Sequence, residues 1–423
     1  MDTFWASFYR AQSNKDGCLL ATTISSTAIS QLKSHPNFLQ TLNANLSQCL
    51  RGYTVVSAWT DILTACHTFS QAPSNPTTRY KAYKDVVSAL HRGYSNNALQ
   101  AWTIPCLYTA GETLRRLALF ADTHAPTTAL ILPESPSEAS LPNQNLEDCA
   151  RQINRLFSLC LSDDSRISSS RKWALYNLAN LLFKIYFRLN RISLCKNILR
   201  SIAVQADELP PLSAFPKSHQ VTYNYYTGVL AFLSEDYPLA DKYLSEAHAK
   251  CLSTSTRNLD LILMYLIPTR LLTSHRIPSK RLLAQSQFLE GLFGPVCDAV
   301  RNADPAGFEA ALERGEEVFV KQRLHLTLER AKYVLLRNLC RRVFLAAPRL
   351  ENGERRTRVP LTEFGAALRV RGAGKAGFDG RDGDEVECLL ANLIYRDLVK
   401  GYIARERGMV VLSRNAAFPG TGC

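Results

Sequence analysis

The chain has 423 residues, 46% of them hydrophobic, and a formal net charge of +13, so it can bury two or three domain cores and favours an anionic partner such as nucleic acid or an acidic protein. Twelve scattered cysteines without a C-x-x-C pair exclude a zinc ribbon and a compact disulfide framework, and they predict buried thiols in a reducing compartment. The N-terminus lacks the pattern of a signal peptide and no apolar run could span a bilayer, so we expect an intracellular protein that does not enter the membrane.

The N-terminal region, residues 1–122, is predicted to be helical. Apolar residues recur at helical spacing, most clearly over residues 80–90 and 107–122. Residues 123–145 then carry four prolines among Ser and Thr, a composition that cannot hold a regular element. We interpret this segment as a linker or surface excursion.

Helices resume in residues 146–345 and are expected to pair as antiparallel hairpins. The predicted pairs are residues 173–189 with 192–206, 221–233 with 238–252, 257–270 with 280–292, and 305–314 with 317–344. Small residues such as Gly228 and Ala240 lie where the second pair would cross. Each hairpin leaves an apolar face open, so several must stack in a tetratricopeptide-like array.

The last part, residues 346–415, is predicted to form a winged helix that caps the stack as part of one body. A short helix over residues 361–370 precedes a second helix, which begins at Asp384 and ends at Gly401. Residues 402–404 and 409–412 flank a polar turn and form a β-hairpin. Residues 416–423 are expected to be a tail.

Positive charge concentrates just before this winged helix. Residues 321–371 hold thirteen Lys or Arg against four acids, an excess of nine. On one long helix, the arginines at 323, 330, 337 and 341 would lie on one face. We predict phosphate contacts here. Two alternatives stay open: a docking face for an acidic protein segment, and a solvated helix face.

Cations of the second helix and of the wing extend the predicted surface, because winged helices use these elements to contact nucleic acid. Glu385 and Glu387 at the start of that helix would repel phosphates, which argues against reading of base sequence. Pairing with another protein is an equal alternative for the winged helix. The full predicted nucleic-acid-binding set is Arg323, Arg330, Arg337, Arg341, Arg342, Arg355, Arg356, Arg358, Lys400, Arg405, Arg407 and Arg414.

No enzymatic constellation is found. The eight histidines form no H-E-x-x-H or H-x-H motif, and G-x-S-x-G is absent. The glycines of residues 372–377 match G-x-G-x-x-G, but a helix rather than a strand precedes them. We therefore predict no catalytic residue, no cofactor and no metal site.

Helical hairpins that end in a winged helix resemble the PCI domain, and within it the signalosome-subunit-twelve-like branch, which includes the PCI subunit of the nuclear mRNA-export (TREX-two) complex. The stretches that carry the resemblance are LFKIYFRLNRISLCKNILRSI from Leu182, YNYYTGVLAFLSEDYPLADKYLSEAHAKC from Tyr223, LTLERAKYVLLRNLCRRVFL from Leu326, and DEVECLLANLIYRDLVKGYIARERGMVVLSRNAAFP from Asp384. Residues 371–383 depart from the family by being longer and richer in glycine.

The resemblance implies a non-catalytic scaffold of a nuclear complex that couples transcription to mRNA processing and export, with the cytoplasm as a second location. The implied partners are a larger PCI-domain scaffold protein, a small acidic disordered protein shared with the proteasome lid, and RNA and double-stranded DNA. Pairing through winged helices is expected to use Leu393, Tyr395, Arg396, Tyr402 and Val410. The alternative is an accessory signalosome subunit that supports removal of a modifier from cullins and binds nucleic acid little. The basic window favours the first.

Overall fold

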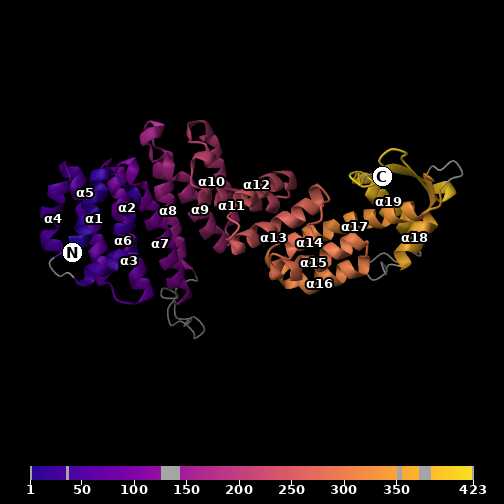
Figure 1. Ribbon diagram of the computed structural model, residues 1–423, viewed down its shortest axis with the longest axis horizontal. Helices are drawn as coiled ribbons and strands as arrows, with labels where there is room; N and C mark the ends of the chain where they lie inside the picture. The colour runs from indigo at the N-terminus through magenta and orange to yellow at the C-terminus, as the bar shows by residue number, and fades with distance from the viewer. Residues whose placement is uncertain (1, 35–37, 125–142, 350–354, 371–382, 422–423) are drawn as a thin grey trace, which may run out of the picture. The chain divides into compact units, whose positions relative to one another are not determined.

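A computed structural model describes residues 2–34, 38–124, 143–349, 355–370 and 383–421. The described chain is mostly helical, with a small antiparallel sheet near its C-terminal end (Figure 1), as predicted. It divides into two compact units, Met1–Tyr226 and Thr227–Cys423. The boundary between the units lies inside one helix, α11 (Lys217–Leu233). It does not coincide with any of the predicted domain boundaries, and the predicted division into domains stays a prediction. None of the described helices is long and apolar enough to cross a membrane.

Unit 1 is built from consecutive helices that pack on their neighbours in the chain. These helices are α1 (Asp2–Asn14), α2 (Gly17–Thr23), α3 (Ser26–Ser30), α4 (Phe38–Cys49), α5 (Tyr53–Gln71), α6 (Pro76–Ser95), α7 (Ile104–Thr123), α8 (Gln144–Leu161), α9 (Leu175–Arg188) and α10 (Ile192–Val204). Aromatic rings fill the core, where Phe8 meets Trp59 edge to face and Phe69 meets Tyr83. Most of the predicted linker, residues 125–142, lies outside the described residues.

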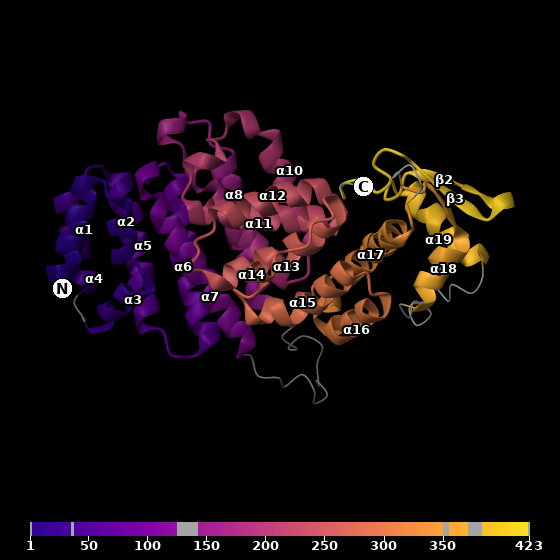
Figure 2. The ribbon, with the colours of Figure 1, turned by 45° about the vertical axis from the view of Figure 1, so that its right-hand side comes forward.

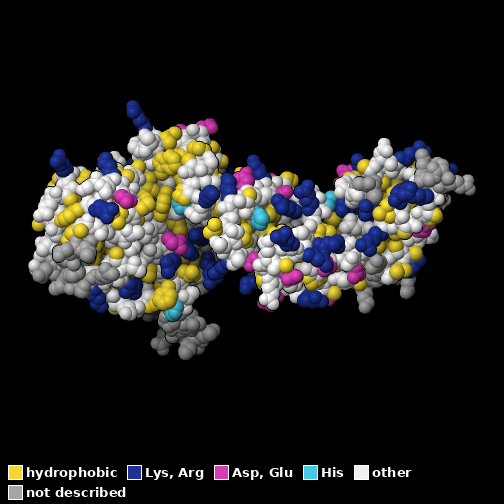
Figure 3. All heavy atoms as spheres, in the orientation of Figure 1, with side chains coloured by type: hydrophobic (Ala, Val, Ile, Leu, Met, Phe, Trp, Pro, Cys, Tyr) yellow, Lys and Arg dark blue, Asp and Glu magenta, His cyan; other side chains and the backbone are white. Residues whose placement is uncertain are grey.

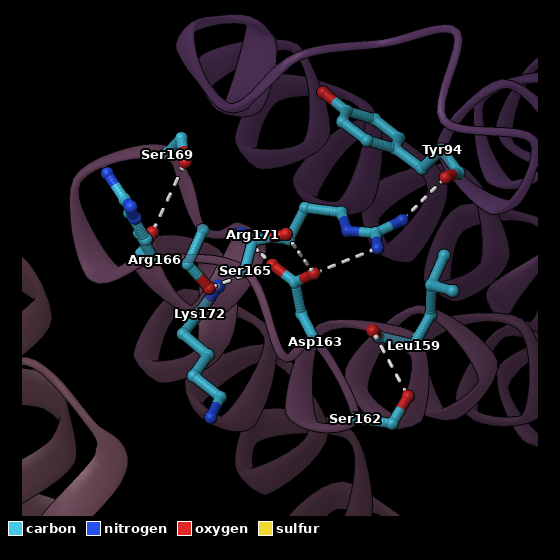
Figure 4. Close-up of polar contacts among 10 residues, drawn as sticks. Tyr94, Leu159, Ser162, Asp163, Ser165, Arg166, Ser169, Arg171 and Lys172 are labelled. Carbon is cyan, nitrogen blue, oxygen red and sulfur yellow. Dashed lines mark hydrogen bonds and ion pairs between the residues drawn. The ribbon is translucent and has the colours of Figure 1, made fainter.

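A buried carboxylate fixes the loop between α8 and α9 (Figure 4). Asp163 accepts hydrogen bonds from the backbone N–H of Arg171 at 2.6 Å and the hydroxyl of Ser170 at 2.8 Å. The Arg171 guanidinium lies 2.9 Å from the same carboxylate and also donates to the carbonyl oxygen of Tyr94 on α6. Because both charged groups are satisfied, this ion pair ties the loop to the helical core.

Unit 2 continues the helical hairpins. Its helices before the winged helix are α12 (Tyr237–Lys250), α13 (Thr256–Thr273), α14 (Lys280–Leu283), α15 (Gln287–Asn302), α16 (Pro305–Lys321) and α17 (His325–Ala346). The predicted close crossing of α11 and α12 is confirmed, because a Cβ at Gly228 would lie 2.7 Å from the Leu244 side chain.

Two predicted helices are each broken in two, so those predictions were wrong. The segment predicted as one helix over residues 280–292 is interrupted where Ser286 adopts an extended conformation and accepts a hydrogen bond from the N–H of Leu289, which starts α15. The segment 317–344 is interrupted by Arg323, whose φ of 58° is left-handed and separates α16 from α17.

The winged helix contains α18 (Leu361–Val370), α19 (Gly383–Tyr395) and a sheet of β1 (Arg358–Pro360), β2 (Gly401–Ala404) and β3 (Met409–Leu412). Strand order is β1-β3-β2, all antiparallel, so β1 is a third strand that the sequence did not predict. In Figure 2 the hairpin of β2 and β3 lies beside α18 and α19. α18 packs against α17 and α19.

Two boundaries of the winged helix differ from expectation. α19 ends at Tyr395, because the chain turns through Asp397, whose φ is 56°, and the N–H of Leu398 then bonds back to Leu393. The segment expected as a tail is packed: Phe418 is fully buried, with its ring 5.6 Å from that of Phe344 on α17. The glycine-rich residues 371–382 lie outside the described residues.

Candidate nucleic-acid and partner interface

The outer face of the winged-helix sheet carries a cross-strand row of side chains. Arg358 on β1 pairs with Val411 on β3, which in turn pairs with Tyr402 on β2. Directly paired residues in antiparallel strands point to the same side of the sheet. Arg358 is exposed and Tyr402 is 63% exposed, so a cation and an aromatic ring flank one half-buried aliphatic residue on the solvent side.

Further exposed groups surround this row. Lys400 precedes β2, Arg407 lies in the turn of the hairpin, and Arg414 follows β3, all three exposed. Gly408 takes a φ of 57°, which lets the turn close behind Arg407. Tyr395 at the end of α19 is 89% exposed. The winged helix therefore offers cations for phosphates and two aromatic rings for bases or for a protein surface.

A basic groove runs along α17. One part has a volume of about 470 Å³ and is lined by Tyr237, Leu272, His275, Arg330, Tyr333, Val334, Arg396 and Leu398. A second part of about 390 Å³ shares Arg330, Tyr333 and Arg396 with the first. The Arg396 guanidinium lies 4.0 Å from the centre of the Tyr333 ring, a cation–π contact that holds the end of α19 against α17.

The cations of the groove differ in how strongly acids neutralise them. Arg330 makes two bonds of 2.9 Å to the carboxylate of Glu235 and a third of 3.1 Å to the hydroxyl of Tyr237. Hydrogen bonds from Arg330 lower the pKa of Glu235. Among the described residues, the Arg396 side chain contacts the Tyr333 ring and has no carboxylate partner, so no acid offsets its charge at the groove wall.

Behind the groove lies a buried arginine. Arg337 is 4% exposed and donates to the side-chain oxygen of Asn338 at 3.0 Å, while its Nη1 has no partner among the described residues. Burial, and secondarily the charge of Arg341, lower the pKa of Arg337. Burial, and then Arg337, lower the pKa of His275. The interior behind the groove thus holds uncompensated positive charge that favours an anion at its mouth.

The structure breaks up the predicted arginine stripe on α17. Arg323 lies in the turn before α17 and not on its face, and Arg337 points into the protein, so the single-face prediction was wrong for both. Arg341 is half-buried and donates to the carbonyl of Thr421, whereas Arg342 is exposed and donates to the carbonyl of Arg301. The turn removes Arg323 from the helix, whereas Arg330, Arg337 and Arg341 keep their spacing within α17 and differ because neighbouring segments cover them to different extents.

The arginines between α17 and β1 serve local structure. Arg355 donates to the carbonyl of Leu345 and lies 5.7 Å from the centre of the Phe344 ring. Arg356 binds the carboxylate of Glu363 on α18 at 2.6 Å. On the wing, Arg405 pairs with Asp384 at 3.0 Å and Glu387 at 3.5 Å. Arg358, Arg407 and Arg414 are thus better placed for phosphates than these three.

Two predicted partner-binding residues were wrong. Leu393 and Val410 are both 0% exposed, because they form the core between α19 and the sheet. Tyr395, Arg396 and Tyr402 are exposed, and their role in partner binding stays a prediction. Tyr333 and His275 were not predicted as groove residues, because the groove brings together segments far apart in the chain, as the contact of Tyr333 with Arg396 shows.

Among the described residues, no cluster of three or more His, Cys, Asp or Glu could hold a metal ion. Burial raises the pKa of the Cys340 thiol on α17 to about 12, so this group is unreactive near neutral pH. In Figure 3, dark-blue Lys and Arg side chains gather over α12 to α17. The arrangement can bind anions and proteins by contact.

Comparisons with known proteins extend this description. Residues 312–414 match the model of the PCI domain. Over its full length the chain is 42% identical to the whole of a Protein CSN12 homolog from Neurospora crassa. It is 44% identical to a Protein CSN12 homolog from Gibberella zeae over 89% of this chain and 81% of that protein. It is 30% identical to PCI domain-containing protein 2 of Danio rerio, over 85% of this chain and 84% of the fish protein.

Proposed function

Because this chain belongs to the family of CSN12 homologs and PCI domain-containing protein 2, we propose that it is a scaffold subunit of a nuclear complex coupling transcription to mRNA processing and export. The PCI domain and the membership in this family are consistent with a non-catalytic scaffold subunit of a protein complex. In the proposal the chain forms, with its partners, a basic surface for RNA and double-stranded DNA.

The observation that carries the proposal is the outer face of the wing. Arg358, Arg407 and Arg414 are exposed, and none of their side chains has an ion-pair partner among the described residues. Three such cations give a salt-sensitive contact with the sugar–phosphate backbone.

Two protein partners complete the proposal. A larger PCI-domain protein pairs with the winged helix through the exposed rings of Tyr395 and Tyr402. A small acidic protein docks along α17, where Arg396 lines the groove and Arg337 supplies positive charge from behind. Carboxylates of such a segment would be attracted to this groove.

The test begins with purification of the tagged chain from its own cells at moderate salt, followed by mass spectrometry and measurement of retained RNA. The variant carries Arg358→Glu, Arg407→Glu and Arg414→Glu. A matched control carries three charge reversals at exposed cations elsewhere in unit 2, Arg257→Glu, Arg281→Glu and Lys321→Glu. Charge reversals at Arg337 and Arg341 are not used in this test, because Arg337 is buried and Arg341 is half-buried, so a reversal there would also disturb the fold.

We expect recovery of a larger PCI protein, a small acidic protein and RNA. The amount of RNA retained by the wing variant should be at least tenfold lower than that of the parent, with the protein partners still recovered. The control should retain the RNA and both proteins. Recovery of the signalosome with its metal isopeptidase and without RNA would overturn the export proposal in favour of the accessory signalosome role. Equal RNA loss in variant and control would show that net charge, and not the wing, retains RNA.

A further inference from the structure

A second basic surface lies in unit 1, on the hairpin of α9 and α10. Residues 165–206 contain eight Lys or Arg and no Asp or Glu, a bias as strong as that of residues 321–371. The eight are Arg166, Arg171, Lys172, Lys184, Arg188, Arg191, Lys196 and Arg200. Such a one-sided stretch either serves internal ion pairs or faces an external anion.

Three of the eight cations serve the fold. Arg171 binds the buried Asp163, as described above. Lys172 is almost fully buried and donates to Glu208 at 2.8 Å. Lys184 is half-buried and lies 3.8 Å from Glu112 on α7. These residues do not contribute to the outer surface of the hairpin.

The exposed side of α10 is different. α10 buries Cys195, Ile198 and Ile202 against α9 and turns Lys196 and Arg200 to solvent. These two are four residues apart, so they share one face and are separated by roughly 6 Å along the helix axis. Like charges at this spacing repel each other, and neither side chain has a hydrogen-bond or ion-pair partner among the described residues.

Two more arginines continue the surface at the turn between the helices. Arg188 is exposed at the end of α9, and its side chain is likewise without a partner among the described residues. Arg191 pairs with Glu147 at 2.8 Å, but both side chains are well exposed, at 59% and 39%. An ion pair this exposed contributes little stability, so Arg191 can exchange Glu147 for another anion at small cost.

The neighbours of these cations favour a phosphate backbone over an acidic protein. Ser193 and Asn197 are exposed on the same helix and offer neutral hydrogen-bond donors. Protein interfaces depend on buried aromatic and aliphatic anchors. On α9 and α10 the one strongly exposed large apolar side chain is Val204 at the far end of α10.

We propose that the exposed face of α10, together with Arg188 and Arg191, is a second binding site for the sugar–phosphate backbone of a nucleic acid. It belongs to unit 1 and is separate from the winged-helix surface, so it does not depend on the function proposed above. Asp207 after α10 is exposed and would repel phosphates, so it bounds the site at that end.

The test measures binding of the purified full-length chain to a fluorescent 20-nucleotide single-stranded RNA and to a 20-base-pair DNA duplex over a range of salt concentrations. The variant is Lys196→Glu with Arg200→Glu. The matched control, Arg51→Glu with Lys81→Glu, makes the same charge change at exposed residues of unit 1, near α5 and on α6. A second variant, Lys196→Ala with Arg200→Ala, keeps strong helix formers at both positions and guards against misfolding.

We expect the Glu pair to weaken RNA binding at least tenfold and the Ala pair about threefold or more, with the control within twofold of the parent. The slope of log affinity against log salt should fall by about 1.4 for the Ala pair on single-stranded RNA, as the loss of two phosphate contacts requires. Weakened DNA binding with unchanged RNA binding would still support the site and assign it to duplexes.

Equal losses in variant and control would overturn the proposal, as would unchanged binding of both nucleic acids. Capture of an acidic peptide by the parent and not by the Ala pair, with RNA binding intact, would also overturn it in favour of a protein ligand. The charge reversals at Arg358, Arg407 and Arg414 are measured in parallel, because a loss there with none at α10 refutes this site while leaving the winged-helix proposal standing.

Discussion

Arg337 and Arg414 carry the same charge in opposite surroundings, and this difference decides what each can do. Arg337 is 4% exposed and has one side-chain partner, Asn338. Arg414 follows β3 and is exposed. A phosphate can reach only the second, although both belong to the predicted binding set. Charge counted from a sequence therefore overstates the usable charge wherever a guanidinium is buried.

Reversal of the charge at Arg337 should lower the stability of the protein, whereas reversal at Arg414 should leave the stability nearly unchanged. Arg337→Glu would remove the hydrogen bonds to Asn338 and replace a long buried side chain with a shorter one, so we expect the free energy of unfolding to fall by about 2 kcal/mol or more. Arg414→Glu should change it by about 0.5 kcal/mol or less. Urea unfolding of the full-length variants measures both changes in free energy. Equal stability of the two variants would contradict the buried position of Arg337.

Asp163 predicts a pH dependence of the stability of unit 1. Burial alone would raise its pKa, but the side chain and backbone N–H of Arg171, with the hydroxyls of Ser170 and Ser165, outweigh burial and hold the pKa well below its usual range. A lowered folded-state pKa stabilises the protein above the ordinary pKa of aspartate, about 4, and this stabilisation is lost as pH falls further.

Asp163→Asn should therefore cost about 3 kcal/mol at pH 7, because it leaves Arg171 without its anion. The difference between parent and variant should shrink as pH falls below about 4, because the carboxylate of the unfolded parent is protonated there while that of the folded parent, with its lowered pKa, stays charged to lower pH. Thermal melting at a series of pH values measures this. A difference that stays constant down to pH 2 would show that the carboxylate charge is not the stabilising group.

At the scale of elements, the sequence predicted regular amphipathic segments well. The helix over residues 361–370 and the strand over residues 409–412 were predicted with their observed bounds, because apolar spacing and turn residues agreed. The end of α19 was missed because Lys400 and Gly401 look like a helix stop. Gly401 instead lies in β2, where a Cβ would collide with the backbone of Val411 on β3.

The site was predicted less well than the fold for a related reason. The exposed cations of the wing follow from local pattern, so Arg407 and Arg414 were placed correctly on the surface. The groove depends on long-range contacts such as that of Arg396 with Tyr333, which leave no periodic signal. The burial of Arg337 depends on the helices that pack against α17, which residue spacing within α17 does not reveal.

Two glycines of unit 2 test the helix packing as a matched pair. Gly228→Ala would place a Cβ 2.7 Å from the Leu244 side chain, so we expect overpacking of α11 against α12 to cost about 1–3 kcal/mol. Gly291 on α15 has no atom within 4 Å of such a Cβ, so Gly291→Ala should stabilise by up to about 1 kcal/mol. Urea midpoints measure both, and shifts of the same sign would refute the close crossing.

At the scale of the whole molecule, unit 2 holds the groove and the wing, and unit 1 holds the second basic surface on α10. In the two proposals the groove takes an acidic protein segment, whereas the wing and α10 each contact a nucleic acid. Damage at one surface should leave binding at the other intact, because the groups of each surface are held by contacts within their own unit.

Partner pairing tests this independence. Tyr395→Ala with Tyr402→Ala should reduce recovery of a larger PCI partner at least tenfold, because two exposed aromatic anchors are removed. RNA binding through α10 should persist. Tyr53→Ala, at an 88% exposed ring in unit 1, is the control. Unchanged partner recovery, measured by affinity purification and mass spectrometry, would place the pairing surface elsewhere.

One consequence of the position of α17 concerns how such a protein can evolve. α17 packs against α13, α15 and α16 and also against α18 of the winged helix. A mutation on most of its surface therefore disturbs two neighbours at once. We expect substitutions among relatives to accumulate at its exposed positions, such as Leu326, Glu329 and Arg342, while new partner preferences arise on the wing, whose outer residues can vary without cost to the core.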